Sequence, residues 1–340
     1  MRILVAMSGG VDSSVAAALL RDEGHEVVGV TMRLWGGPSD TGCCSAADVD
    51  DARRVAQQLD LPHFVFDYAD EFARHVVDPY VADHRAGRTP NPCIECNRHL
   101  KFDRLLDHAY ELGYDAVATG HHVRVAERDG RPLLRRAVDL DKDQSYVLHV
   151  LDPEVLGRCR FPIGDLTKAD VRALAAELGL RTAAKPESQD VCFISRAHGR
   201  RAFLGDRIPL RPGRLVDTEG RDVGEVDAIE LVTVGQRRGL RLAGAAERRF
   251  AIDVDVEAGT VVVGGTDDLL VTETPVPDLV VHTAARDELT AQTSAHGRPA
   301  PVELVDGGVR WPAPHTRVAP GQAVVLYDGD LVVGGGTAGR

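Results

Sequence analysis

A glycine- and serine-rich segment near the N-terminus constrains the fold more than any other feature. Residues Ser8–Ser14 read SGGVDSS and follow the apolar run Ile3–Met7, which has the length of a buried strand. A helical pattern, Val11–Arg21, starts inside the segment and stops near Gly24. Glycines let a backbone approach a ligand closely, and free N–H groups at a helix start suit phosphate. The segment therefore predicts a phosphate-binding loop, although it lacks the lysine of the GxxxxGK[ST] loop.

The first half of the chain alternates strand and helix patterns, which is typical of a parallel, doubly wound α/β sheet. The expected strands are Ile3–Met7, Val27–Met32, His63–Tyr68 and Ala116–Thr119, and the expected helices are Val11–Arg21, Asp48–Leu59, Phe102–Leu112 and Lys168–Leu178. Ligands of such sheets bind at the carboxyl ends of the strands. Ser8, Trp35, Asp67 and Gly120-His121 all follow expected strands, so we expect a site at that edge.

The second half of the chain has a different pattern. After about Ser195 the apolar runs shorten and glycine and proline become frequent, which favours one or two small β domains. The last of these, near Ala258–Arg340, has the pattern of a β-barrel. The length of 340 residues is consistent with two or three domains in total.

Composition excludes several classes of protein. Hydrophobic residues make up 44% and charged residues 27%, which argues against disorder. No apolar run reaches the roughly 18 residues of a membrane helix, and the N-terminus becomes polar too early for a signal peptide. We therefore expect a cytoplasmic protein. Six cysteines are too few for a disulfide scaffold, so their positions point to chemistry.

Charge is unevenly distributed along the chain. The net charge of −12 argues against nucleic-acid binding by the whole surface. However, 196–214 contains six arginines and one acid, and 231–250 contains five arginines and one acid. These stretches are either one face for a polyanion or two solvated loops. Only four residues are lysine, against 36 arginines, which we interpret as a coding preference.

Three cysteines stand in motifs. Cys93 and Cys96 form a Cys-x-x-Cys pair, which can chelate a metal or act as a redox pair, and Cys192 lies in SQDVCF. Cys159 stands in no motif and is interpreted as structural. The adjacent pair Cys43-Cys44 is a poor candidate for a shared tetrahedral zinc site with Cys93 and Cys96.

Longer stretches carry a resemblance to a known family. They are AMSGGVDSS (6–14), GRTPNPCIECN (87–97), the helix with Lys101-Phe102, ATGHHVR (118–124), KDQSYVL (142–148), FPIGDLTKADVR (161–172), KPESQDVCFI (185–194), GQRRGL (235–240) and PGQAVVLY (320–327). The first resembles the pyrophosphate loop of ATP pyrophosphatases, which adenylate an acceptor. The number and order of all the stretches resemble the bacterial tRNA-specific 2-thiouridylases (the MnmA/TrmU family), which thiolate carbon 2 of the wobble uridine in tRNA.

The resemblance implies domains, reactants and partners. The implied domains are an ATP pyrophosphatase catalytic domain at 1–195, a central tRNA-contacting domain at 196–257 and a C-terminal β-barrel at 258–340. The implied reactants are ATP with Mg²⁺ and a tRNA with a wobble uridine, and the products include AMP and pyrophosphate. The implied partner is a persulfide donor protein supplied by a cysteine desulfurase.

The resemblance also implies roles for individual residues. The nucleotide site would comprise Ala6, Met7, Ser8, Gly9, Gly10, Val11, Asp12, Ser13, Met32 and Gly120. The tRNA contacts would be Asn91, Pro92, Cys93, His121, Lys142, Asp143, Gln144 and Gln322. Cys96 would be the first catalytic cysteine and Cys192 the persulfide carrier, and the two would end the reaction as a disulfide.

Three positions depart from the family pattern. Ser294 stands where an arginine is usual, so the contact pair Ser294-Ala295 is left out of the site. His122 stands where an aromatic residue is usual, and we interpret it as structural. Cys93 stands where many members have an aspartate that could handle the ring proton of the uridine. With Cys96 and Cys192, it could alternatively ligate a [4Fe–4S] cluster.

Two other functions are considered. An ATP-dependent amide ligase would use the same loop but would leave Cys96 and Cys192 without a task. A metal-held RNA-binding module would use the cysteines and the arginine stretches but would leave the SGGVDSS loop unexplained.

Overall fold

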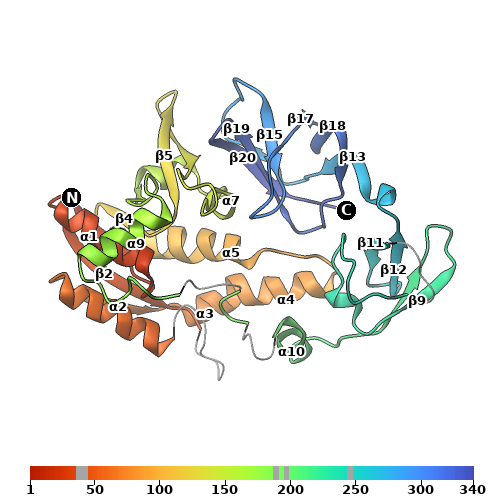
Figure 1. Ribbon diagram of the computed structural model, residues 1–340, viewed down its shortest axis with the longest axis horizontal. Coiled ribbons are helices and arrows are strands. Elements are labelled where there is room, and N and C mark those ends of the chain that lie inside the picture. Colours follow the sequence, from red (N-terminus) through yellow and green to blue (C-terminus); the bar gives the residue numbers. More distant parts are fainter. Residues whose placement is uncertain (36–44, 187–190, 195–198, 243–247) are drawn as a thin grey trace. The chain divides into compact units, whose positions relative to one another are not determined.

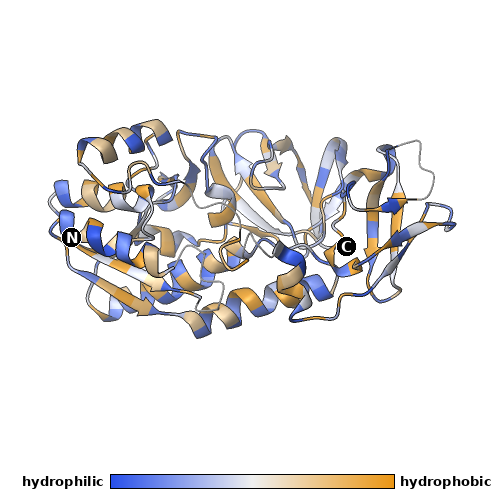
Figure 2. Cartoon of the chain, turned by 60° about the horizontal axis from the view of Figure 1, so that its bottom comes forward, coloured by the Kyte–Doolittle hydropathy of each residue, from blue (hydrophilic) through white to orange (hydrophobic). Residues whose placement is uncertain are grey.

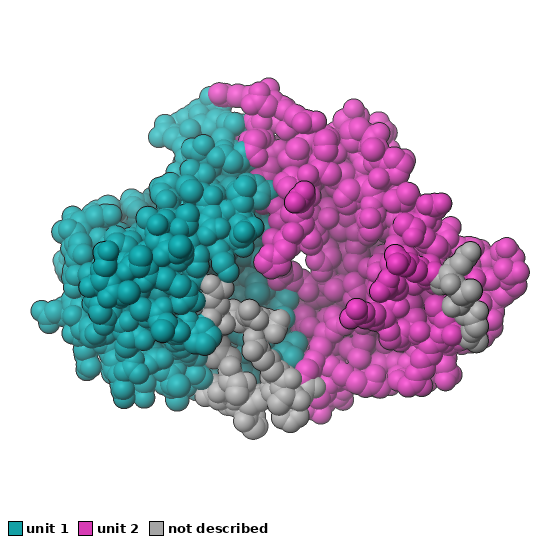
Figure 3. All heavy atoms as spheres, in the orientation of Figure 1, with its two compact units in different colours: residues 1–77, 92–197, 330–333 teal, residues 78–91, 198–329, 334–340 magenta. Residues whose placement is uncertain are grey.

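The computed structural model describes residues 1–35, 45–186, 191–194, 199–242 and 248–340. The chain divides into two compact units, coloured separately in Figure 3. Unit 1 comprises 1–77, 92–197 and 330–333, and unit 2 comprises 78–91, 198–329 and 334–340. The predicted domain boundaries at 195 and 257 stay a prediction.

Unit 1 is built on a parallel sheet with the strand order β3-β2-β1-β4-β7. Its strands are β1 (Arg2–Ala6), β2 (Glu26–Arg33), β3 (His63–Asp67), β4 (Ala116–Thr119) and β7 (Cys159–Arg160). The strand order changes direction between β1 and β4, which is where ligands of such sheets bind. The predicted doubly wound α/β fold is confirmed.

Three helices pack on one face of this sheet. They are α1 (Val11–Asp22), α2 (Ala46–Gln58) and α9 (Lys168–Glu177). Their buried residues join Ile3 and Val5 of β1 in one apolar cluster. Helix α9 begins with a capping box, in which Thr167 and Asp170 bond each other's backbone N–H groups. This cap fixes the start of α9, which lies beside α1 (Figure 1).

Unit 1 also contains helices and strands that the sequence pattern did not predict, or predicted only in part. They are α3 (Ala69–Phe72), the π-helix η1 (Ala73–Val77), α5 (Pro92–Glu95), the π-helix η2 (Cys96–Arg104), α6 (Leu105–Glu111), β5 (Val123–Arg128), β6 (Arg131–Arg136), α7 (Ser145–Leu148) and α8 (Pro153–Gly157). The helix expected at Phe102–Leu112 is therefore the end of a longer helical stretch. Its π-helical segment begins at Cys96, and π-helical turns are frequent at functional sites.

Unit 2 is mainly β structure, as the pattern after Ser195 predicts. Its first sheet has the order β10-β9-β8-β12-β11 and surrounds an apolar cluster that includes Leu215, Ile229 and Val261. The strands are β8 (Gly213–Val216), β9 (Asp222–Val226), β10 (Arg241–Leu242), β11 (Phe250–Asp255) and β12 (Thr260–Gly264). The helical elements of unit 2 are α4 (Asp78–Arg85), α10 (Gly199–Gly205), η3 (Ile229–Leu231) and η4 (Asp267–Leu269).

The C-terminal part of unit 2 contains two further groups of strands, β13-β18-β17 and β16-β15-β19-β20, with β14 paired to β20. They are β13 (Leu270–Pro275), β14 (Val280–Val281), β15 (Leu289–Gln292), β16 (Ala300–Pro301), β17 (Glu303–Val305), β18 (Gly308–Thr316), β19 (Ala323–Asp328) and β20 (Leu331–Thr337). The first residues of β20 belong to unit 1, where Leu331 pairs with Arg135 of β6.

Hydropathy follows the architecture. In Figure 2 the hydrophobic colour runs along many strands, whereas the helices carry hydrophobic and hydrophilic residues together. This is the pattern of sheets covered by amphipathic helices. Within the described part of the chain, every helix is too short or too polar to traverse a lipid bilayer.

Candidate active site

The predicted phosphate loop is a closed turn between β1 and α1. The backbone N–H of Ser8 donates to Oγ of Ser13 over 3.1 Å, and the hydroxyl of Ser14 donates to the carbonyl of Gly10 over 2.7 Å. Gly9 has a φ of +71°, and a Cβ there would collide with the carbonyl oxygen of Asp48. Gly10 precedes α1 and has no side chain with which to cap the helix, so the first N–H groups of α1 suit an anion.

Gly120, which the resemblance assigns to the nucleotide site, lies against this loop. It follows β4, and a Cβ at this position would lie 2.5 Å from the backbone nitrogen of Ser13 and 2.6 Å from the carbonyl carbon of Asp12. Only glycine allows the backbone after β4 to approach so closely. Met32, another predicted nucleotide residue, is buried in β2, the other neighbour of β1.

Asp12 is held by two side chains from other parts of unit 1. The ammonium of Lys168 donates to both carboxylate oxygens over 2.7 Å, and Nε2 of His122 lies 3.3 Å from Oδ1. Burial opposes ionisation of Asp12, but the contacts with His122 and Lys168 outweigh it and hold its pKa below the ordinary value. Asp12 is therefore a carboxylate at neutral pH. The interpretation of His122 as purely structural is incomplete, because its ring contacts this carboxylate.

Lys185 contacts the other end of the loop. Its ammonium donates to the carbonyl of Gly9 over 3.0 Å and to Asp48 and Asp51 of α2 over 2.7 Å each. Burial works against the charged ammonium, but the two carboxylates outweigh it and hold the pKa of Lys185 above its ordinary value. The loop is therefore bounded by one lysine at Gly9 and another at Asp12.

Lys168 and Lys185 have no role among the predicted site residues, although both contact the loop. Both stand inside motifs that carry the resemblance, but their partners lie more than a hundred residues away in sequence. The only sequence feature that could have indicated a role for these residues is the scarcity of lysine in the chain. We interpreted it as a coding preference, whereas three of the four lysines contact predicted site residues.

His121 is a buried, neutral imidazole. Its Nδ1 lies 2.7 Å from Oγ1 of Thr119, and its Nε2 lies 3.4 Å from the ammonium of Lys101. Burial and the charges of Lys101 and His122 hold the pKa of His121 well below its usual range. An uncharged ring so close to the loop can donate or accept a hydrogen bond without adding charge.

The predicted tRNA residues 142–144 form a turn beside His122. The side-chain oxygen of Gln144 accepts from the backbone N–H of His122 over 2.9 Å. Asp143 is 4% exposed and accepts from Arg136 over 3.0 Å and from the hydroxyl of Ser145 over 2.6 Å. The structure thus uses Asp143 within the turn, whereas Lys142 is half-buried.

The predicted catalytic cysteines lie in unit 1 in different environments. Cys96 begins η2 and is 8% exposed, Cys192 is half-buried, and Cys93 in α5 is exposed. Phe193, next to Cys192, packs against Trp35 and Phe72 with ring centroids 6.2 Å and 5.6 Å apart. Cys96 and Cys192 are not joined by a disulfide here, so the implied disulfide stays a prediction for a later reaction state.

Cys159 and the pair Cys43-Cys44 are the cysteines for which no catalytic role is predicted. Cys159 is buried, its thiol donates to the carbonyl of Val155 over 3.1 Å, and burial raises its pKa to about 12. These features agree with a structural role. Cys43 and Cys44 lie outside the described residues.

The two implied metal groups, a [4Fe–4S] cluster and Mg²⁺, require different ligands from the protein. Within the described part of the chain, no group of three or more His, Cys, Asp or Glu side chains is arranged to hold a metal ion. Cys93, Cys96 and Cys192 are therefore not gathered here as ligands of a cluster. Mg²⁺ needs less from a protein, because it binds through one or two carboxylates together with substrate phosphates. Asp12 is the carboxylate beside the loop, and Mg²⁺ would have to share its oxygens with the ammonium of Lys168, which contacts both over 2.7 Å.

Unit 2 contains the predicted tRNA residues Asn91 and Gln322, whereas Pro92 begins α5 in unit 1. The side-chain amide of Gln322 donates to the carbonyl of Thr89, and the backbone N–H of Thr89 donates to the carbonyl of Pro320 over 2.8 Å. These bonds hold the segment that ends at Asn91. In the arginine stretches, Arg211 is paired with the buried Glu230, whereas Arg237 and Arg238 are exposed. The proposed polyanion face stays a prediction.

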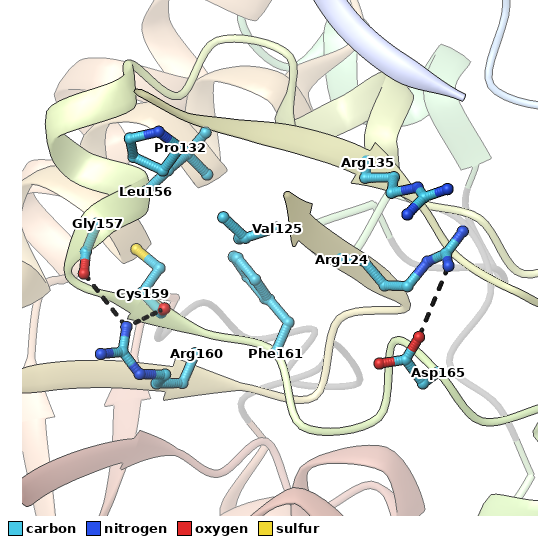
Figure 4. A pocket seen from close by; sticks show the side chains of 10 residues that line it. All are labelled: Arg124, Val125, Pro132, Arg135, Leu156, Gly157, Cys159, Arg160, Phe161 and Asp165. Carbon is cyan, nitrogen blue, oxygen red and sulfur yellow. Dashed lines mark hydrogen bonds and ion pairs between the residues drawn. The ribbon is translucent and has the colours of Figure 1, made fainter. Parts of the chain in front are cut away.

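A hollow of about 510 Å³ in unit 1 lies apart from the loop residues (Figure 4). Val125 and Phe161 form part of its lining, and Arg124 and Arg135 lie together on one side. Arg124 is 3.6 Å from Asp165, and Arg135 is 2.6 Å from Asp330. Because these carboxylates already neutralise the two arginines, the hollow is a weaker candidate for nucleotide binding than the loop.

The chain matches three family models in order. They are described as the tRNA methyl transferase HUP domain at residues 1–196, the tRNA methyl transferase PRC-barrel domain at 201–265 and the aminomethyltransferase beta-barrel domain at 286–338. The three matches agree with an α/β domain followed by a small central domain and a C-terminal barrel.

The chain is also similar to curated proteins over its whole length. It is 47% identical to the tRNA-specific 2-thiouridylase MnmA of Corynebacterium kroppenstedtii, over 99% of this chain and 94% of that protein. It is 48% identical to the tRNA-specific 2-thiouridylase MnmA of Mycolicibacterium smegmatis, over 100% of both. Among solved structures, the U34-tRNA thiolase NcsA from Methanococcus maripaludis with its [4Fe-4S] cluster has 17% identity and a TM-score of 0.38, covering 60% of this chain and 63% of that one. This last likeness is too low to carry an argument.

The close approach at Gly120 generates a prediction. Gly120→Ala should weaken ATP binding about tenfold or more, because overpacking of about 1–3 kcal/mol displaces the loop at Asp12 and Ser13. Binding is measured by calorimetry with a non-hydrolysable ATP analogue. Gly157→Ala is the matched control, because its Cβ would meet only Pro132 at 3.9 Å. Equal affinities in the two variants would place the nucleotide elsewhere.

Proposed function

Because the chain belongs to the MnmA family of tRNA-specific 2-thiouridylases, we propose that it replaces the carbon-2 oxygen of the wobble uridine in tRNA with sulfur, in a reaction driven by ATP. The observation that carries the proposal is the loop at Ser8–Ser13 in the same unit as Cys96 and Cys192. The loop supplies a site for the activating nucleotide, and the cysteines supply a route for sulfur.

The first step activates the uridine. The oxygen on carbon 2 is a poor leaving group, so it attacks the α-phosphorus of ATP, the bond to the β-phosphate breaks, and pyrophosphate leaves. Backbone N–H groups of the loop and of the start of α1 stabilise the negative charge on the leaving pyrophosphate. Mg²⁺, held by Asp12 and the phosphates, would neutralise part of that charge.

The second step transfers sulfur. The terminal sulfur of a persulfide on Cys192 attacks carbon 2, and AMP leaves with the original oxygen. The thiolate of Cys96 then attacks the sulfur of Cys192, the bond to the transferred sulfur breaks, and 2-thiouridine is released. The transferred sulfur gains two electrons, and Cys96 and Cys192 lose two as they form a disulfide. A thiol reductant restores both cysteines.

The positions of the cysteines support these different tasks. Cys192 is half-buried, so a donor protein could reach its thiol and load it with sulfur. Cys96 is only 8% exposed, which protects its thiol from oxidants in the solvent. The target base must leave its stack to reach these groups, which is less costly in a single-stranded anticodon loop. We therefore propose tRNA as the substrate and a persulfide-carrying protein as the sulfur source.

The persulfide route is favoured over an iron–sulfur cluster. A cluster requires thiolates from Cys93, Cys96 and Cys192 together. In the described residues these three are not gathered around a common centre, and Cys93 is exposed. The persulfide route needs only Cys96 and Cys192, and Cys93 then replaces the usual aspartate as a group for the ring proton of the uridine.

The nucleotide products test the proposed function against the ligase and binding-module alternatives. Pyrophosphate and AMP should form only with tRNA, and 2-thiouridine should appear in the digested tRNA when persulfide is supplied. Cys192→Ser should still release pyrophosphate but should form no 2-thiouridine, because the attacking sulfur is absent. Mass spectrometry of nucleosides, with free sulfide excluded, gives the readout. AMP formation with amines instead of tRNA would support a ligase, and no turnover would support a binding module.

Cys93→Asp separates the two sulfur routes. The persulfide route predicts substantial thiolation by this variant when it is purified without air and without iron, because a carboxylate restores the usual residue. The cluster route predicts the loss of both thiolation and iron–sulfur absorbance, with anaerobic wild type carrying about four irons. That second result would overturn the persulfide route.

A further inference from the structure

His122 connects two parts of the candidate site that are distant in sequence. Its backbone N–H donates to the side-chain oxygen of Gln144 over 2.9 Å, and its backbone carbonyl accepts from the N–H of Gln144 over 3.0 Å. Its ring nitrogen Nε2 lies 3.3 Å from Oδ1 of Asp12. The predicted tRNA turn therefore holds the backbone of His122, and the side chain of His122 reaches the acid of the nucleotide loop. All three residues lie in unit 1.

The contact with Asp12 fixes the tautomer of the His122 ring. A carboxylate oxygen can only accept a hydrogen bond, so Nε2 carries a proton and donates to Oδ1. His122 is 3% exposed, and its Nδ1 is buried without a hydrogen-bond partner in the described part of the chain. A buried nitrogen without a partner carries a free-energy cost that an apolar ring would avoid. The imidazole is therefore explained by its bond to Asp12 rather than by packing.

The turn that holds His122 is anchored next to Gln144. The carboxylate of Asp143 is 4% exposed and accepts from the guanidinium of Arg136 and from the hydroxyl of Ser145. These bonds fix the backbone on both sides of Gln144. The side chain of Gln144 is half-buried, and within the described residues only its oxygen is bonded. Its NH₂ group is therefore available to donate to RNA.

The planar amide of Gln144 provides a physical route for coupling, because its oxygen and its NH₂ group turn together. An RNA oxygen that accepts from the NH₂ group would hold the amide oxygen toward the N–H of His122. This restraint would limit the motion of His122 and, through the ring, that of the Asp12 carboxylate. When one ligand has already ordered a site, less ordering remains for a second ligand, so the two ligands favour each other's binding.

We propose that His122 is a positioning residue that couples tRNA binding at Gln144 to ATP binding at the loop, because it transmits the restraint on Gln144 to the carboxylate of Asp12. The inference rests on the proposed function, in which Gln144 contacts tRNA and the loop binds ATP. It gives a physical reason for adenylation to follow tRNA binding. By linkage, ATP strengthens tRNA binding by the same factor.

Calorimetry on the full-length protein tests this coupling. The dissociation constant of a non-hydrolysable ATP analogue with Mg²⁺ is measured without RNA and with a saturating tRNA that carries a wobble uridine. The coupling factor is the ratio of the two constants. We expect wild type to bind the analogue at least about fivefold more tightly with tRNA, which is the lower end of typical couplings. His122→Phe removes the donor at Nε2, so its coupling factor should fall below about twofold.

Three further variants test the route of the coupling. In His122→Gln the side-chain NH₂ group replaces Nε2 and can still donate to Asp12, so the coupling factor should stay near that of wild type. Gln144→Met removes both hydrogen-bonding groups of the amide, and its coupling factor should fall as in His122→Phe. The double variant should show no further fall, because both changes interrupt one route. Gln144→Met also provides the test if His122→Phe has a lower melting temperature than wild type.

His25→Phe is the matched control. Nε2 of His25 lies 3.4 Å from a carboxylate oxygen of Glu23, and His25 precedes β2 at the edge of the sheet opposite the loop. The substitution therefore removes an imidazole–carboxylate contact from the same unit but away from the candidate site. Both of its dissociation constants should match those of wild type.

The outcomes distinguish coupling from simple support of the loop. If His122→Phe weakens analogue binding by the same factor with and without tRNA, His122 only supports Asp12, which would overturn the proposal. A wild-type coupling factor close to one, with both ligands bound, would overturn it as well. If wild type fails to bind the tRNA or the analogue, the proposed function itself is contradicted, and this inference with it.

Discussion

The contact between the ammonium of Lys168 and the carboxylate of Asp12 is the interaction on which the candidate site depends. Asp12 stands in the first turn of α1 and is partly buried, so its charge requires a partner. Lys168 satisfies both carboxylate oxygens and at the same time places the start of α9 against the loop. Without this partner, the partly buried carboxylate of Asp12 would repel the phosphates that the loop is predicted to bind.

The positions of other groups follow from that contact. Once α9 is placed, Arg172 can hold the backbone near Lys185, and Lys185 can reach the glycine turn of the loop. The close approach of Gly120 closes the opposite side. Gly9 and Gly120 allow the backbones to approach each other closely, and Lys168 and Lys185 supply positive charge. The conformation of the loop therefore depends on its backbone and on lysines that are distant in sequence, as well as on its own side chains.

Features formed by residues that are close in sequence could be predicted, whereas contacts between distant residues could not. The strand, glycine turn and helix around Ser8–Ser13 are neighbours in the chain, so their pattern predicted the loop and the α/β fold. The partners of Asp12 could not be found in this way, because Lys168 is 156 residues distant. His122 was interpreted from its unusual residue type, and only the folded chain shows that its ring reaches Asp12. The π-helical turn at Cys96 likewise has no pattern in the sequence.

The central claim is that the loop chemistry activates the oxygen on carbon 2 of uridine by adenylation. It is tested most directly with tRNA whose wobble uridine carries ¹⁸O at carbon 2, supplied with ATP and persulfide-loaded enzyme. Mass spectrometry should find the ¹⁸O in AMP and sulfur in its place in the uridine. Unlabelled AMP beside 2-thiouridine would show that the oxygen leaves by another route and would contradict the account.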